Sequence, residues 1–156
     1  MKANNYHFDW SDEERRILNF LNTADDSFHE PLSMRVDLAE YAKKLSKNAK
    51  NLFIKRESKD VAHVAFYQVD QEKSIFITSI AINEANQGLG LGSYILSCLK
   101  QYATEKNYRY IKLEADSRSL NLVRFYVKNQ FIEHDRKGHM LCLRYDLTNM
   151  KKNDIT

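Results

Sequence analysis

Residues 87–92, Gln-Gly-Leu-Gly-Leu-Gly, have the types and spacing in this chain that are best suited to binding chemistry. Three of the four glycines of the sequence fall within five residues, directly after an apolar run and before a stretch with helical periodicity. Glycine has no Cβ, so backbone N–H groups can converge on one point, and the positive end of the following helix favours an anion. The segment therefore predicts a site for a pyrophosphate group.

Two common phosphate-binding loops do not fit the residues that flank this segment. A P-loop needs Lys and then Ser or Thr after its last glycine, but Gly92 is followed by Ser93-Tyr94, which excludes it. A dinucleotide fingerprint would use Ser93 as its third small residue and Glu114 as its acid. However, only 64 residues follow Gly92, and hairpin-like strands precede the loop, which disfavours a doubly wound fold. A glycine turn without a ligand is a further alternative.

Two amphipathic helices are predicted ahead of the first strand. Ser11-Asp12-Glu13-Glu14 has the pattern of a capping box, and apolar residues follow at helical spacing, which predicts a helix over residues 11–22. Asp37, with Glu40 three residues later, repeats the signal and predicts a second helix. Residues 23–33 between them are polar, contain the single proline and are predicted to form a loop.

The rest of the chain shows strand and helix patterns in turn. Three β-rich runs with short polar spacers predict antiparallel hairpins, and the third run is apolar on both phases, so we expect a central strand covered on both faces. Strands are predicted over residues 51–57, 61–69, 74–82, 109–115, 131–136 and 139–147, and helices over residues 91–106 and 119–129. The resulting order is ααβββαβαββ, an α/β (α+β) fold with a mixed sheet.

The overall composition describes a globular chain. Its 156 residues, 43% hydrophobic and 29% charged, suit a single domain over residues 1–150 with a polar tail at residues 151–156. A net charge of +3 is too small to indicate nucleic acid or a membrane as the partner. No apolar run approaches the roughly 20 residues that span a bilayer, and the N-terminal residues lack the apolar stretch of a signal peptide. We therefore expect a cytoplasmic protein.

The cysteines and a basic run have simple explanations. Cys98 and Cys142 lie far apart without metal-ligand spacing, so both are expected to be small buried apolar residues, and no metal is implied. The four lysines within residues 43–50 lie opposite the apolar stripe of the second predicted helix. This arrangement favours a solvated helix surface over a nucleic-acid interface.

The glycine-rich segment resembles the coenzyme A loop of the GNAT acyltransferase superfamily. Gln87, Gly90 and Gly92 match that loop's pattern, Gln/Arg-x-x-Gly-x-Gly/Ala, position by position. The Phe-Tyr pair at residues 125–126, followed by Phe131, resembles the Phe-Tyr-x-x-x-Gly-Phe run of a later helix and strand in the family. The resemblance implies a single-domain GNAT fold with a mostly antiparallel sheet and helices on both faces. It also implies that acetyl-CoA (coenzyme A) is the cofactor and that an acetyl group moves directly to an amine of a small molecule or sugar.

The resemblance also assigns the residues of the site. A tyrosine at the position of Tyr126 serves the family as general acid, and a phenol of pKa about 10 can protonate a departing thiolate of about 8.5. The backbone of residues 80–82 would pair with the pantetheine arm and donate to the oxyanion, while Ser119 replaces the family's usual asparagine. Glu84 stands where many members have proline, and Gln130 stands where they have glycine. The implied cofactor-binding residues are Ile80, Ala81, Ile82, Gln87, Gly88, Leu89, Gly90, Leu91, Gly92, Ser93 and Ser119.

The general base stays open at the level of sequence. The candidates are Glu84, Glu114, Asp116, His63, and Ser79 acting through a bound water. We predict that Glu114 and Tyr126 are the catalytic residues.

The resemblance places acceptor recognition in the first two helices, their loop and the closing hairpin. Within the loop, His29, Glu30 and Arg35 are expected to bind a polar acceptor. O-acetyl transfer to a sugar hydroxyl, and a non-catalytic acyl-CoA-binding sensor or partner domain, are the alternative functions. The resemblance also allows a homodimer through the closing strands.

Overall fold

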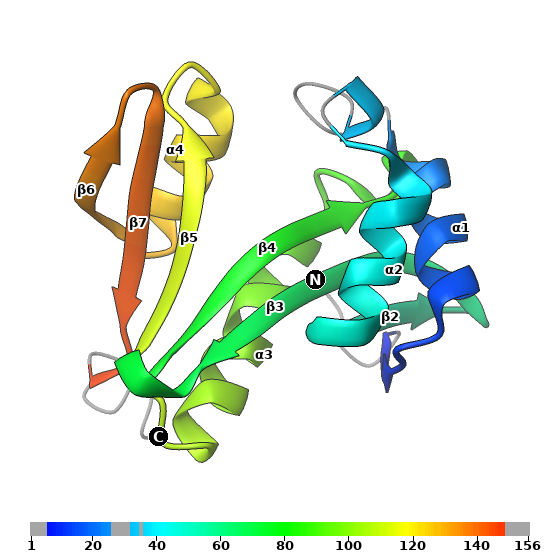
Figure 1. Ribbon diagram of the computed structural model, residues 1–156, viewed down its shortest axis with the longest axis horizontal. Coiled ribbons are helices and arrows are strands. Elements are labelled where there is room, and N and C mark those ends of the chain that lie inside the picture. The colour runs from blue at the N-terminus through cyan, green and yellow to red at the C-terminus, as the bar shows by residue number, and fades with distance from the viewer. Residues whose placement is uncertain (1–5, 26–31, 35, 149–156) are drawn as a thin grey trace. The chain divides into compact units, whose positions relative to one another are not determined.

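The computed structural model describes residues 6–25, 32–34 and 36–148 (Figure 1). The strands are β1 (His7–Trp10), β2 (Lys50–Arg56), β3 (Lys59–Val69), β4 (Ser74–Ile82), β5 (Tyr110–Asp116), β6 (Ile132–Lys137) and β7 (Met140–Asp146). The helices are α1 (Glu14–Ala24), α2 (Leu38–Asn48), α3 (Leu91–Glu105) and α4 (Leu120–Lys128). The strand order in the sheet is β1-β2-β3-β4-β5-β7-β6. Strands β4 and β5 are parallel, whereas the pairs β1–β2, β2–β3, β5–β7 and β6–β7 are antiparallel, which confirms the mixed, mostly antiparallel sheet.

The chain divides into two compact units, which are described one at a time. The first comprises Met1–Tyr67 and Thr78–Tyr94, and the second comprises Gln68–Ile77 and Ile95–Thr156. Helices α1 and α2 belong to the first unit, and α4 with most of α3 belongs to the second. A single domain over residues 1–150 stays a prediction.

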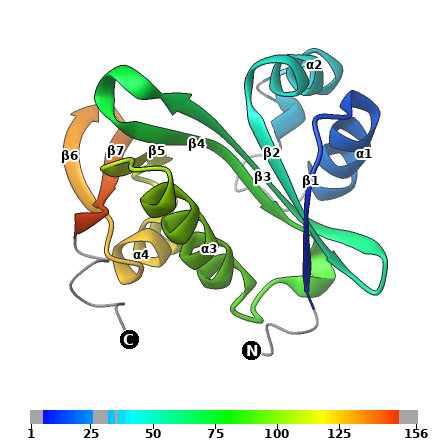
Figure 2. The same cartoon turned by 90° about the horizontal axis from the view of Figure 1, so that it is seen from below.

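Helices α1 and α2 lie side by side against the strands of the first unit (Figure 2). On α1 the apolar residues recur with helical spacing, so that they form one face, and this face is buried. Residues of β2, β3 and β4 complete the same core. Its buried members are Ile17, Phe20, Leu21, Ala24, Ala42, Leu45, Phe53, Ala65 and Ala81.

The two helix starts that the sequence predicts have different outcomes. Helix α2 begins as expected, because the Asp37 carboxylate accepts a hydrogen bond from the Glu40 N–H at 3.1 Å. The expected start of α1 is wrong by three residues, since Glu13 is its N-cap and makes no side-chain capping bond. The hydroxyl of Ser11 instead accepts from the Glu13 N–H at 3.3 Å, before the first helical turn.

Strand β1 was not expected from the sequence, so the observed order of strands and helices begins with a strand. It pairs with β2 from the His7–Lys55 pair to the Trp10–Leu52 pair. Its apolar side chains contact aromatic rings of the first unit, with Phe8 stacked on Tyr94 at 5.6 Å between ring centroids. These contacts hold a four-residue strand that is too short to show a pattern of its own.

The second unit is built on three antiparallel strands in the order β5-β7-β6, joined to the first half of β4. Residues 74–77 of β4 pair with residues 110–113 of β5, and β5 pairs with β7 along its whole length. Figure 1 shows β5, β7 and β6 side by side. Phe131, just after α4, packs against these strands, and its ring lies 5.8 Å from that of Tyr145 on β7.

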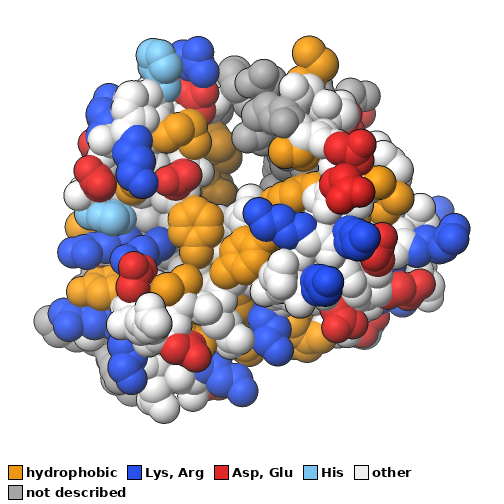
Figure 3. All heavy atoms as spheres, in the orientation of Figure 1, with side chains coloured by type: hydrophobic (Ala, Val, Ile, Leu, Met, Phe, Trp, Pro, Cys, Tyr) orange, Lys and Arg blue, Asp and Glu red, His pale blue; other side chains and the backbone are white. Residues whose placement is uncertain are grey.

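Three further expectations concern the surface charge, the burial of the cysteines and membrane-spanning helices. Acidic and basic side chains are interspersed on the face in Figure 3 rather than gathered by sign. Cys142 is buried as expected, but Cys98 is only half-buried, so the expectation for Cys98 is wrong. No helix within the described residues is long and apolar enough to cross a membrane.

Candidate functional site

The glycine-rich loop connects β4 to α3, as its sequence predicts. Gly88 and Gly90 have φ values of +77° and +81°, the left-handed region in which a Cβ is strained. The first hydrogen bond of α3 runs from the Tyr94 N–H to the Gly90 carbonyl at 3.1 Å. The N–H groups of Leu91 and Gly92 precede it, so helix geometry directs them outward at the positive end of the helix dipole.

The loop offers open backbone of the kind that a pyrophosphate needs. A Cβ added at Gly88 would meet no atom within 4 Å, so a ligand can approach the backbone there. Gly88, Leu89 and Gly90 are exposed, whereas Leu91 is buried and anchors the start of α3. Backbone donors combined with a helix N-terminus fit the charge and the size of a diphosphate.

Polar side chains brace the loop against the end of β4. The side-chain amide of Gln87 donates to the backbone carbonyl of Ile82 at 2.9 Å. The side-chain amide of Asn86 donates to the side-chain oxygen of Asn83 at 2.6 Å. The Asn83 N–H donates to the Val61 carbonyl of β3 at 2.9 Å. Sequence reasoning singled out Gln87 but missed both asparagines, whose spacing of three residues was the available signal.

The residues expected to pair with a pantetheine arm form the last part of β4. Ala81 is buried in the core under α1 and α2, whereas Ile80 and Ile82 are half-buried. Ser93 lies in the first turn of α3 and is half-buried. The first unit thus brings together the end of β4, the loop and the start of α3.

Tyr126 lies in the second unit, where the C-terminal end of α4 fixes it. The Phe131 N–H donates to the Tyr126 carbonyl at 3.0 Å, and the Gln130 N–H donates to the Val127 carbonyl at 2.9 Å. This pair of bonds is a Schellman motif, which needs a left-handed residue after the helix, and Gln130 has a φ of +73°. Burial raises the pKa of the Tyr126 phenol to about 12.

Two other expected site residues also belong to the second unit. Ser119 is buried at the N-cap of α4, and its side chain makes no capping bond. Glu114 is exposed on β5, where the Cys142 thiol lies 3.8 Å from its carboxylate. Burial raises the pKa of Cys142, and the Glu114 and Asp135 carboxylates raise it further.

The structure argues against His63 as the general base, one of the sequence-based candidates. The side chain is fully buried in β3, and its Nε2 lies 2.9 Å from the Asn51 side-chain oxygen. Burial lowers the pKa of His63 from 6.5 to about 3, so the ring is neutral at physiological pH. Its place under α1 makes it part of the core, where the rings of Phe20 and Phe53 lie 6.3 and 4.8 Å from it.

Two further candidates for the general base are the acids Glu84 and Asp116. Glu84 is exposed in a short turn after β4. Asp116 accepts two hydrogen bonds from the Arg118 guanidinium. These bonds lower its pKa, together with a bond from the Arg118 N–H.

The residues expected to bind the acceptor, His29, Glu30 and Arg35, lie outside the described residues. Within the described part of the chain, no group of His, Cys, Asp and Glu could hold a metal ion.

Comparison with known proteins gives one family. The model of the "Acetyltransferase (GNAT) family" matches residues 9–131. No curated protein matches the chain in sequence. Solved structures match it closely in fold but at low sequence identity.

Three of these structures illustrate the match. A chimera of spermidine N-acetyltransferase from Vibrio cholerae and hSSAT has a TM-score of 0.78 at 13% identity, over 96% of this chain and 99% of that one. The ribosomal-protein-S18-alanine N-acetyltransferase from Escherichia coli has a TM-score of 0.73 at 16% identity, over 90% and 94%. An N-acetyltransferase from Staphylococcus aureus Mu50 has a TM-score of 0.67 at 15% identity, over 92% and 99%. With its fold and the family match over residues 9–131, this chain belongs to the acetyltransferase (GNAT) family and is an acyltransferase.

Proposed function

We propose that this protein transfers an acetyl group from acetyl-CoA to the amine of a small molecule or sugar. Members of its family generally use acetyl-CoA as the acyl donor. The observation that carries the proposal is the geometry of the loop, with Gly88 and Gly90 in the left-handed region ahead of the N-terminus of α3. The N–H groups of Leu91 and Gly92 would hold the pyrophosphate of the donor, with Gln87 bracing the loop.

Tyr126 is the residue that we propose as proton donor to the leaving thiolate. A pKa of about 12 keeps the phenol protonated throughout the physiological range, as a proton donor requires. The same burial makes it a weaker acid than an ordinary tyrosine. Equally apolar surroundings would also raise the pKa of the CoA thiol. The gap between that pKa and the pKa of Tyr126 would then be smaller than for a thiol in water.

Direct transfer is favoured over a covalent acyl-enzyme. A nucleophilic cysteine needs a lowered pKa, whereas burial and nearby carboxylates raise the pKa of Cys142. The exposed Glu114 carboxylate would accept the proton of the acceptor amine through water. An amine is favoured over a sugar hydroxyl because a hydroxyl requires a stronger base, and His63 is fully buried and bonded to Asn51.

Substitution of Tyr126 by phenylalanine tests the proposal against a sensor function. Turnover is measured as release of the CoA thiol in the presence of primary amines, and affinity as the Kd of acetyl-CoA. Removal of a general acid lowers kcat by about a hundredfold or more, with little change in Kd. Tyr102→Phe is the matched control, because the Tyr102 hydroxyl accepts a bond from Gln68 in the second unit.

Two results would contradict the proposal in different ways. A Tyr126→Phe variant with unchanged kcat would remove the assigned role of Tyr126 as proton donor. A wild-type protein that binds acetyl-CoA but acetylates no amine would favour the acyl-CoA-binding sensor.

A further inference from the structure

Lys100 connects α3 to the C-terminal end of α4 within the second unit. Its ammonium group donates a hydrogen bond to the Asn129 carbonyl at 2.9 Å and lies 4.0 Å from the centroid of the Tyr145 ring. The Lys100 side chain is half-buried. A cation is favourable at this end of a helix, because the last carbonyls lack helical partners and carry the negative end of the helix dipole.

Asn129 connects Lys100 to the backbone of Tyr126. As the C-cap of α4, Asn129 donates its N–H to the carbonyls of Phe125 and Tyr126, at 3.2 and 3.1 Å. Its side-chain amide also donates to the Phe125 carbonyl, at 2.8 Å. Since Lys100 binds the carbonyl of Asn129, it holds the residue that closes the last turn of α4.

Aromatic rings give a second connection between Lys100 and Tyr126. The Tyr145 ring, which contacts the Lys100 ammonium, lies 5.8 Å from the Phe131 ring, and the Phe131 ring lies 5.6 Å from that of Tyr126. Lys100 is therefore linked to Tyr126 in two ways, through the backbone at the end of α4 and through packed rings.

The rest of α4 is loosely packed in the described part of the second unit. Tyr126 is the buried residue of this helix, whereas Leu120, Leu122 and Val127 are 61, 40 and 55% exposed. The N-cap, Ser119, makes no side-chain capping bond. A helix of nine residues is marginal without tertiary contacts, so the contacts at its C-terminal end largely determine where Tyr126 lies.

Resting on the proposed function, we infer that Lys100 is a positioning residue, which holds the end of α4 so that Tyr126 can protonate the leaving thiolate. Burial is the cause of the raised pKa of Tyr126, with no contribution from a charge among the described residues. Lys100 therefore acts through Asn129 and the rings and not on the phenol directly. A misplacement of about 1 Å can slow a reaction by about a hundredfold, so loss of this contact should lower kcat.

Amide hydrogen exchange tests the contact without any acceptor. Lys100→Met keeps an unbranched side chain and removes the charge. In this variant the N–H groups of Asn129 and Phe131, both bonded to the Tyr126 carbonyl, should exchange about tenfold faster than in the wild type. The Val123 N–H, bonded to the Ser119 carbonyl in the first turn, should keep its rate. Unchanged exchange at Phe131 would overturn the inference.

Turnover tests whether the contact matters to the reaction. Release of the CoA thiol is measured at saturating acetyl-CoA with spermidine, glucosamine or alaninamide, and the amine that the wild type acetylates fastest is used. Lys100→Met should lower kcat by about tenfold and leave the KM for the amine and the Kd of acetyl-CoA within about twofold. Lys100→Arg keeps a cation for the carbonyl and the ring, and should retain kcat within about threefold of the wild type.

A double-mutant cycle separates the positioning of Tyr126 from a general loss of stability. In the Tyr126→Phe background no phenol is left to misplace, so Lys100→Met should change kcat by less than about twofold. The same substitution should lower Tm by about 2–4 °C in both backgrounds. A tenfold loss of kcat in both backgrounds would overturn the inference, because Lys100 would then not act through Tyr126.

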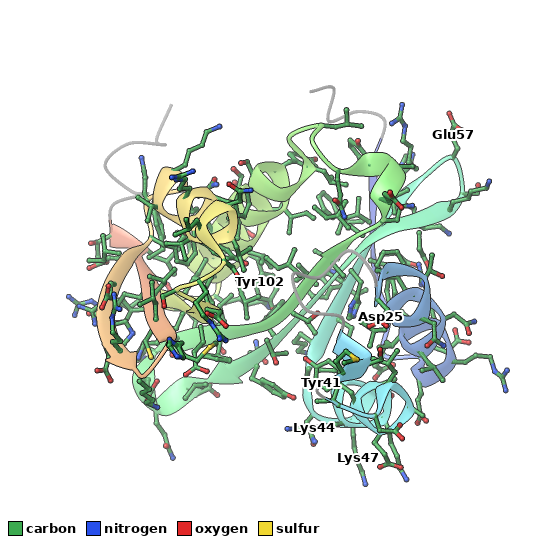
Figure 4. The ribbon with its side chains drawn as sticks, turned by 90° about the horizontal axis from the view of Figure 1, so that it is seen from above. Asp25, Tyr41, Lys44, Lys47, Glu57 and Tyr102 are labelled. Carbon is green, nitrogen blue, oxygen red and sulfur yellow. The ribbon has the colours of Figure 1, made fainter. Side chains whose placement is uncertain are left out.

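Lys106→Met is the matched control in the same unit. The Lys106 ammonium lies 5.8 Å from the centroid of the Tyr102 ring, so this variant also removes a lysine next to a tyrosine. Tyr102, labelled in Figure 4, lies on α3 two residues after Lys100, and residues with this spacing do not share a helix face. Lys106→Met should leave both kcat and the exchange at Phe131 unchanged. Equal losses in the two variants would overturn the role assigned to Lys100.

The outcomes separate this inference from the proposed function. If Tyr126→Phe lowers kcat and Lys100→Met does not, the proposed function stands and Lys100 is not a positioning residue. If the wild type acetylates none of the three amines, the proposed function fails, and the inference fails with it.

Discussion

The backbone N–H of Phe131 donates to the carbonyl of Tyr126 at 3.0 Å, and the rings of the same two residues pack edge to face with their centroids 5.6 Å apart. The first contact fixes the end of α4, and the second fixes the tyrosine ring. The proposed proton donor is therefore held by the helix C-terminal motif itself. The family's Phe-Tyr-x-x-x-Gly-Phe run thus has a structural reason in this chain.

Gln130 is the residue of that motif with an unfavourable backbone conformation. Its φ of +73° costs a residue with a Cβ about 1 kcal/mol relative to glycine. Gln130→Gly should therefore raise the free energy of unfolding by about 0.5–1 kcal/mol in urea titration. Gln130→Val, with a branched Cβ, should lower it. A glycine variant that is less stable than the wild type would contradict this account of the motif.

His63 should make the stability of the protein depend on pH in the acidic range. Its pKa is about 3 in the folded protein against 6.5 when unperturbed, so the unfolded chain binds more protons between these values. The contribution of His63 to the free energy of unfolding is fully present above pH 6.5. It is lost as the pH is lowered toward 3, by about 1.4 kcal/mol per pH unit. His63→Gln, which keeps a donor for Asn51, should flatten that part of the profile of unfolding free energy.

An exposed histidine provides the comparison for this experiment. His7 lies on β1 with its side chain exposed, and His7→Gln is the matched control for replacing a histidine by glutamine. If His63→Gln retains the full slope of the wild type, titration of this buried ring does not govern acid unfolding.

Arg16 should contribute more to stability than an ordinary surface ion pair. Its guanidinium binds both oxygens of Asp60 at 2.9 and 2.7 Å, binds Asp9 at 2.7 Å, and lies 4.1 Å above the ring of Phe53. Lysine cannot reproduce this two-point contact, so Arg16→Lys should cost about 1–3 kcal/mol of unfolding free energy. Asp9→Asn should cost less than about 1 kcal/mol, because Asp9 is half-exposed. Equal costs for the two variants would contradict this ranking.

Much of the fold could be predicted because the strong patterns are local. The spacing of Ile17, Phe20 and Leu21 gives α1, and the short polar spacers give the hairpins. Strand β1 could not be predicted, because four residues show no period and their stability comes from pairing with β2.

The candidate site could be predicted only at its glycines, because glycine itself indicates an unusual backbone conformation. Gly88 and Gly90 indicate the loop, and they have the positive φ values that glycine favours. The buried hydroxyls of Tyr67 and Ser79, which have no partner among the described residues, had no such signal, since their burial depends on the fold. The neutral state of His63 likewise follows from burial and not from its neighbours in sequence.

Calorimetric titration of acetyl-CoA into the purified protein tests the central claim most directly, with Gly90→Asp and Gly138→Asp measured alongside the wild type. Both glycines have positive φ, +81° and +59°, but Gly138 lies in the turn between β6 and β7. We predict a single saturable site in the wild type and in Gly138→Asp, and binding at least about tenfold weaker in Gly90→Asp, where a carboxylate faces the pyrophosphate. A folded wild type that gives no binding heat, or a Gly90→Asp variant that binds as tightly as the wild type, would contradict the claim that residues 87–92 bind the acyl donor.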